Sequence, residues 1–148
     1  MRSHASAQMS AEERGALYLD ASALVKLVLP EAESAALVAA LASGLELITS
    51  TVGAIETRRA LLAAGDDGEL ADAAEEVLGA VTLVGITEPI RRAAGTLRPA
   101  ALRTLDAIHL ATALSFGSEL EAFVAYDRRL AEAALAAGLD VRAPDAAA

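Results

Sequence analysis

The sequence contains no cysteine and no tryptophan, and it has only two phenylalanines, two tyrosines and one lysine. The absence of cysteine excludes a disulfide framework, a thiolate metal site and a thiol nucleophile, and it fits a reducing compartment. No apolar run approaches the roughly 18 residues that a membrane span requires. The first residues are polar and lack the apolar core of a signal peptide. We therefore predict a cytoplasmic protein with no membrane segment.

Small aliphatic side chains take the place of the scarce aromatic ones. The chain has 148 residues, 55% of them hydrophobic, and most of these are Ala, Leu or Val. This length suits one domain with one continuous core. We predict a disordered extension over residues 1–15, a single domain over 16–144 and a tail over 145–148. The sequence leaves open whether Met9 is the native start.

The formal net charge is −9, which opposes broad electrostatic capture of nucleic acid. All basic residues except Lys26 are arginines, the side chain suited to bidentate contact with phosphate. They include three adjacent pairs, which are Arg58 with Arg59, Arg91 with Arg92, and Arg128 with Arg129. The codon bias of a GC-rich genome explains the arginines equally well.

Short apolar segments alternate along the chain with longer segments of helical periodicity. The predicted strands are 16–20, 46–50, 81–86, 121–127 and 139–144. The predicted helices are 22–30, 31–44, 51–65, 69–80, 88–97, 104–117 and 127–138, with Ser22 and Thr104 as the caps of two of them. This alternation predicts an α/β fold, a three-layer α/β/α sandwich with a mostly parallel central sheet of four to five strands.

Four acidic residues are predicted to meet at one edge of this sheet. Asp20 ends the first strand and Asp127 lies at the exit of the fourth, where open parallel sheets bind their ligands. Glu56 lies in the helix after the second strand and Asp106 in the first turn of the helix before the fourth. Their apolar neighbours make a carboxylate unfavourable unless it is paired or bound to a metal.

Carboxylates gathered in one crevice repel one another by up to about 4 kcal/mol for a pair at 4 Å and an effective dielectric near 20. A divalent cation removes that repulsion, and oxygen ligands without cysteine favour Mg²⁺ or Mn²⁺ over Zn²⁺. Such a site activates water against a phosphodiester. The acids therefore predict a metal-dependent nuclease.

Four segments of the sequence resemble the successive acidic motifs of PIN-domain proteins, in particular the VapC toxins of bacterial toxin–antitoxin pairs. These segments are YLDASALVKL, AIETRRALL, LRTLDAIHLATAL and FVAYDRRLAEAA. Each motif alone is weak, but the four follow the family's order from about residue 16 to Pro144. The resemblance implies a Mg²⁺-dependent endoribonuclease that a small antitoxin inhibits, and it implies a homodimer.

The resemblance also assigns residues to the site. In motif order, the catalytic and metal-binding acids would be Asp20, Glu56, Asp106 and Asp127. Ser22 would support the metal or its water, because the family has a Ser or Thr two residues after the first acid.

Each acid also has a simpler structural interpretation. Asp20 and Asp127 fit helix N-caps, and Asp106 fits a favourable charge at the start of a helix. Glu56 fits an ion pair with the arginines that follow it on the same helix face. For Asp127 the cap and the metal role are compatible.

Three further residues have two interpretations each. Ser22 fits a simple helix cap. His109, three residues after Asp106, fits a metal ligand or general base, but a buried and hydrogen-bonded core histidine is the more common case. Arg128 and Arg129 fit either contact with substrate phosphates or a solvated helix face.

Two other functions suit the same motifs: a catalytically silent PIN-like binding protein, and a PIN nuclease of RNA processing outside a toxin–antitoxin pair. A phosphoryl-accepting receiver domain does not fit, because Asp20 has no acidic neighbour and Lys26 is the only lysine. Since aromatic residues for base stacking are scarce, we expect RNA shape and phosphate placement to select the substrate.

Overall fold

The computed structural model of the protein describes residues 15–65 and 68–145. Most of the predicted extension, with His4 and Met9, lies outside the described residues. So do residues 66 and 67, which lie between two predicted helices, and the last three residues of the predicted tail. The predicted domain boundaries stay predictions.

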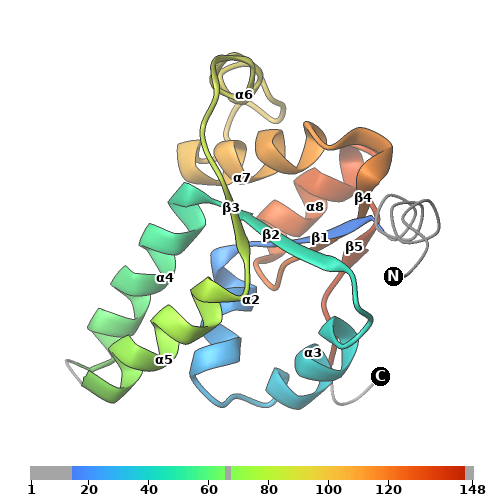
Figure 1. Cartoon of the computed structure of the whole chain (residues 1–148). Helices are drawn as coiled ribbons and strands as arrows, with labels where there is room; N and C mark the ends of the chain where they lie inside the picture. The colour runs from blue at the N-terminus through green and yellow to red at the C-terminus, as the bar shows by residue number, and fades with distance from the viewer. Residues whose placement is uncertain (1–14, 66–67, 146–148) are drawn as a thin grey trace, which may run out of the picture.

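A five-stranded sheet forms the centre of the molecule (Figure 1). Its strands are β1 (Ala16–Leu19), β2 (Glu46–Ser50), β3 (Thr82–Val84), β4 (Leu120–Val124) and β5 (Val141–Arg142). They lie in the order β3-β2-β1-β4-β5, and every neighbouring pair is parallel. The carboxyl ends of all strands therefore share one edge, with β1 in the middle.

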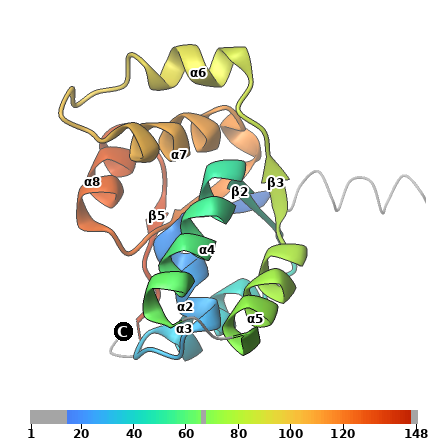
Figure 2. The same cartoon turned by 90° about the vertical axis from the view of Figure 1, so that its left-hand side faces the viewer.

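Helices cover both faces of the sheet, and the predicted three-layer α/β/α sandwich is confirmed. The helices are α2 (Ala21–Val28), α3 (Ser34–Leu41), α4 (Thr51–Ala64), α5 (Gly68–Gly79), α6 (Glu88–Ala94), α7 (Thr104–Leu114) and α8 (Arg128–Ala136), with a short 3₁₀ helix η1 (Gly117–Glu119). Figures 1 and 2 show α7 and α8 on one side of the sheet, with α6 outside them, and α2 to α5 on the other.

Alternate residues of the central strands supply the two halves of the core, as the two-residue period of a strand requires. Tyr18 and Phe123 are fully buried toward α7 and α8, where their rings stack at 5.2 Å between centroids. Leu19 and Val124 face the opposite way and pack with residues of α2 to α5. The core therefore holds Tyr18 rigidly beside the carboxyl edge of β1.

Three local predictions were wrong. The segment 81–86 was predicted as a buried strand, but β3 is a three-residue edge strand and Leu83 is 42% exposed, because no strand covers its outer side. Thr104 is the first residue of α7, whose N-cap is Arg103. Ser22 lies inside α2, whose N-cap is Asp20.

In the described part of the chain, no helix has the length and apolar character needed to cross a bilayer.

Candidate active site

Asp20 follows the last residue of β1 and is only 3% exposed. Its backbone N–H donates to the carbonyl of Val124 at 3.2 Å, so the sheet fixes its position. Its Oδ1 accepts the backbone N–H of Ala23 at 3.0 Å and thereby caps α2. Burial raises the pKa of this carboxyl from its ordinary value of 3.8 to about 6. The fold therefore keeps Asp20 in place although its negative charge is unfavourable there.

Ser22 supports Asp20 directly. Its hydroxyl donates to Oδ1 of Asp20 at 2.6 Å and accepts the backbone N–H of Tyr126 at 2.9 Å. This pair of bonds ties the exit of β1 to the exit of β4. Ser22 thus holds the first acid of the site, which is a different role from the helix cap that the sequence suggested.

Glu56 is bound by His109 and, among the residues that the structure describes, by no arginine. Nε2 of His109 lies 2.5 Å from Oε1 of Glu56. A carboxylate can only accept, so we assign the imidazole proton to Nε2, which donates to Glu56. Nδ1 then accepts the hydroxyl of Tyr18 at 2.6 Å, and that hydroxyl accepts the backbone N–H of Ser50 at 3.1 Å. Arg58, an alternative partner of Glu56 on its helix, pairs with Glu75 instead.

The histidine of this chain of bonds is 1% exposed, so the prediction of a buried, hydrogen-bonded His109 is confirmed. Gly53 makes room for its ring. A Cβ at position 53 would lie 3.1 Å from Cε1 of His109 and 2.4 Å from Oγ1 of Thr49. Because Gly53 is one turn before Glu56 on α4, the absent side chain lets α4 approach α7 where the two residues bond.

Asp106 lies on α7, and Asp127 is the residue directly before α8. Asp106 is half-buried in the first turn of α7, and burial is the main cause of the rise in its pKa, followed by the charge of Asp127. Asp127 is exposed, and its Oδ1 accepts the backbone N–H of Leu130 at 3.0 Å. The prediction that Asp127 caps the helix after β4 is confirmed.

The four acids share one electrostatic neighbourhood. After burial and its hydrogen bonds, the charge of Asp127 contributes to the raised pKa of Asp20. Glu56 also raises the pKa of Asp106, by less than burial and Asp127 do. These influences link Asp20 with Asp127, and Asp106 with both Asp127 and Glu56.

Comparisons with known proteins identify the family of the chain. The family model of the PIN domain matches residues 17–135. The chain belongs to the PIN-domain family. The predicted family is thus confirmed.

Similar proteins span nearly the whole of this PIN-domain chain. Ribonuclease VapC47 of Mycobacterium tuberculosis (strain CDC 1551 / Oshkosh) is 38% identical over 134 residues, which cover 88% of this chain and 98% of that protein. Ribonuclease VapC35 of the same strain is 46% identical over 132 residues, with coverage of 86% and 96%. The crystal structure of Mycobacterium tuberculosis VapC20, described as a Sarcin-Ricin loop cleaving toxin, has a TM-score of 0.66, 21% identity and coverage of 83% and 95%. At this identity, its likeness shows the fold.

The acids of this PIN domain fit a divalent cation by their donor chemistry. Within residues 15–65 and 68–145, no three acidic or histidine side chains stand close enough to hold one ion among them. Mg²⁺ commonly keeps several waters and takes only one or two carboxylates. Hard oxygen donors such as carboxylates suit such an ion. That all four acids ligate one metal stays a prediction.

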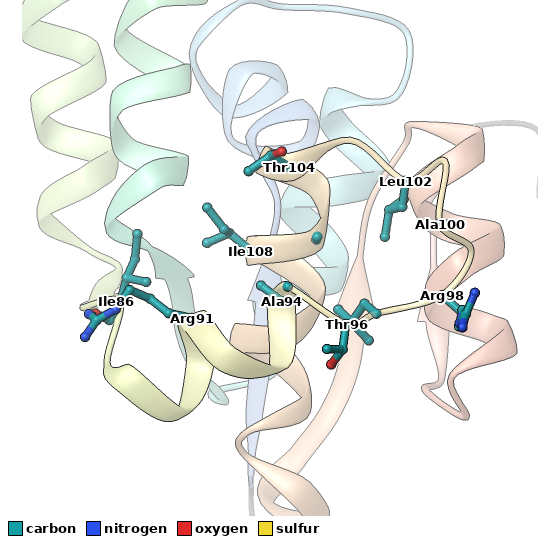
Figure 3. Close-up of a pocket in the computed structure, with 12 residues that line it drawn as sticks. Ile86, Arg91, Ala94, Thr96, Arg98, Ala100, Leu102, Thr104 and Ile108 are labelled. Atoms are coloured by element: carbon teal, nitrogen blue, oxygen red, sulfur yellow. The ribbon is translucent and has the colours of Figure 1, made fainter.

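A large cavity of the PIN domain lies away from the acids. It has a volume of about 730 Å³ and lies between α6, the loop that follows it and α7 (Figure 3). From α7 it is lined by Thr104, Ala107 and Ile108, whereas Asp106 and His109 project from the opposite side of that helix. None of the four acids lines this cavity.

Sequence analysis missed the link from Tyr18 through His109 to Glu56. The spacing of Asp106 and His109 indicated one helix face, but it gave no sign of a partner 53 residues away. The available signal was a polar ring on an otherwise apolar helix face, because a buried imidazole needs hydrogen-bond partners. The partner itself follows only from the packing of α4 against α7.

Proposed function

We propose that this protein is a VapC-type toxin, an endoribonuclease that hydrolyses RNA phosphodiesters with a divalent cation, Mg²⁺ or Mn²⁺. One observation carries the assignment of the site. Asp20 is buried at the carboxyl edge of the central strand with a pKa raised by burial to about 6, and the charge of Asp127, another of the four acids, adds to that rise. The VapC ribonucleases that resemble the chain over most of its length support the substrate class.

The acids divide the work of holding the ion. Asp20, fixed by two hydrogen bonds to Oδ1, would be the central ligand. Glu56, Asp106 and Asp127 would hold the ion directly or through its water molecules. When bound, the ion activates water and stabilises the charge that develops on the phosphate and the leaving oxygen.

Several further features are proposed on the same basis. A toxin of this type has a small cognate antitoxin, and we propose a homodimer in the cytoplasm. The scarcity of exposed aromatic side chains supports selection of RNA by shape. Tyr18 and Phe123 are fully buried, and Phe116 and Tyr126 are partly buried against the core.

The decisive experiment is cleavage of structured RNA by the purified protein with Mg²⁺ or Mn²⁺. Cleavage should stop with EDTA and in Asp20→Asn, because Asn keeps an oxygen for the Ala23 and Ser22 bonds but removes the charge. Asp140→Asn is the matched control. Asp140 precedes β5 at the opposite edge of the sheet and bonds to Arg142.

Equal cleavage by the wild type and Asp20→Asn would overturn the assignment of the site. No cleavage by the wild type, after removal of any co-purified partner, would favour a catalytically silent binding protein. Growth arrest on expression, relieved by a short gene encoded beside this one, distinguishes a toxin from a nuclease of RNA processing.

A further inference from the structure

The basic side chains of the described residues differ in whether they form ion pairs. Four of them have carboxylate partners: Lys26, Arg58, Arg92 and Arg142. The other six form no ion pair with any described residue: Arg59, Arg91, Arg98, Arg103, Arg128 and Arg129. Of these six, Arg103, Arg128 and Arg129 lie within three residues of Asp106 or Asp127 in the sequence.

Two of these unpaired arginines line a cleft of about 420 Å³ between the start of α7 and α8. Arg103 comes from the loop before α7 and Arg129 from the first turn of α8. Asp106, one of the four acids of the site, lines the same cleft. Glu132 adds one negative charge further along α8. The cleft therefore opens directly onto the candidate site.

The charges of the cleft are suited to a phosphate. Among the smaller influences on the pKa of Asp106, which burial raises, the positive charge of Arg103 acts to lower it. Its charge thus reaches the acid without an ion pair that would occupy its donors. A guanidinium with free N–H groups binds phosphate bidentately. With a net charge of −9, the protein repels a polyanion over most approaches.

We propose that the cleft between Arg103 and Arg129 binds a backbone phosphate of the RNA strand, next to the phosphodiester held at the acids. The proposal rests on the proposed ribonuclease function. It adds the path of the RNA strand across the surface, which runs from the acids toward α8. An acidic segment of a protein partner would meet the same charges. RNA is favoured because Asp106 places the cleft and the reacting site side by side.

The test measures binding separately from cleavage. The inactive Asp20→Asn protein is the parent, and a labelled structured RNA is titrated by fluorescence anisotropy at several salt concentrations with Mg²⁺ present. Arg103→Gln and Arg129→Gln should each weaken binding roughly tenfold, since each loses a charged but exposed contact. Each should also reduce the slope of log K against log salt by about 0.7 to 0.9.

Two further variants sharpen the result. Glu132→Gln should tighten binding about twofold, because it removes the opposing charge from the cleft. Arg92→Gln is the charge-matched control, since Arg92 lies on α6 and pairs with Glu88, and its binding should equal that of the parent. Thermal unfolding checks that all variants are folded.

Three results would overturn the proposal in distinguishable ways. Parent-like binding and salt slope in both cleft variants would refute the phosphate site, even where the wild type cleaves RNA. An equal loss in Arg92→Gln would show that only net charge matters. If the cleft variants bound RNA normally but lost a co-purifying protein, the cleft would belong to that partner. Absence of both cleavage by the wild type and RNA binding by the parent would refute the proposed function as well.

Discussion

The two sides of α7 differ: one lines a cavity, and the other carries residues of the candidate active site. One side, with Thr104, Ala107 and Ile108, lines a cavity of about 730 Å³ (Figure 3). The other side carries Asp106 and His109, which interact with acids from β1, α4 and α8. One helix of eleven residues thus separates a roomy cavity from a crowded charged site.

This difference teaches where the reactive region of such a fold lies. The common expectation that the largest apolar pocket marks the site would select the space under α6. Unfavourable charge points instead to the carboxyl edge of the sheet, where the fold buries Asp20 and raises its pKa. A site for a small hydrated cation needs charge and oxygen donors, and it needs little volume.

The largest effect should come from removing charge on the acidic side of α7. Asp106→Asn should reduce RNA cleavage by more than the roughly 100-fold that loss of an outer-shell group costs a metal site. Thr104→Val, a change of similar size on the cavity side, should leave the rate within about twofold. Rates under single-turnover conditions give the comparison. Similar losses in both variants would mean that the two sides do not differ in function.

The next effect concerns the bond that holds Glu56. His109→Asn should lower Mn²⁺ affinity about 10- to 100-fold, because Glu56 loses the donor that orients it. Titration followed by electron paramagnetic resonance measures this without RNA. Mn²⁺ affinity unchanged in His109→Asn would show that the histidine is structural only.

Tyr18→Phe separates this positioning role from simple core packing. It keeps the ring stacked on Phe123 but leaves the Ser50 N–H without its acceptor and the ring of His109 without its donor. We expect a smaller loss of Mn²⁺ affinity than in His109→Asn and a loss of stability of about 1–3 kcal/mol. A loss of stability with no change in affinity would place Tyr18 outside the site.

The sequence predicted the architecture because periodicity records which sides of an element are buried. β2 has the predicted bounds, Glu46–Ser50, and α4 ends one residue before the predicted end at Gly65. The error at β3 has a physical cause. An apolar segment such as 81–86 looks the same whether a strand covers one edge of it or both, so sheet position is invisible to periodicity.

The residues of the candidate site could be predicted from the sequence, but the hydrogen bonds between them could not. The sheet-edge rule located Asp20, since it depends only on where a strand ends. Which donor holds Glu56 depends on the packing of α4 against α7, which brings residues 53 positions apart into contact. The role of Ser22 likewise depends on the backbone N–H of Tyr126, which lies just after the end of β4. The local sequence gives no information about either of these contacts, because both depend on how distant segments pack.

A fourth prediction uses the unfavourable burial of Asp20. In EDTA at neutral pH, Asp20→Asn should be more stable than the wild type, by at most about 3 kcal/mol for a pKa raised from 3.8 to about 6. The variant keeps an acceptor for the Ala23 and Ser22 bonds and no longer buries a charge. Urea unfolding measures the difference.

The pH dependence of that difference follows from its sign. Because the folded state binds the Asp20 proton more tightly than the unfolded state, wild-type stability falls as the pH rises from about 4 to about 6. The advantage of Asp20→Asn should therefore be absent below about pH 4 and complete above about pH 6. A constant advantage across this range would mean that the gain has another origin. Saturating Mg²⁺ should stabilise the wild type and so remove the stability advantage of Asp20→Asn.

The smallest effect should come from filling the cavity on the other side of α7. Ala94 lines it from α6 and is half-buried, so Ala94→Leu adds apolar volume to an open space and should change stability by less than about 1.5 kcal/mol. Cleavage should stay within twofold, because none of the four acids lines that cavity. A loss comparable to that of Asp106→Asn would show that α7 transmits the packing of one side to the charges of the other. The two sides would then be one functional unit.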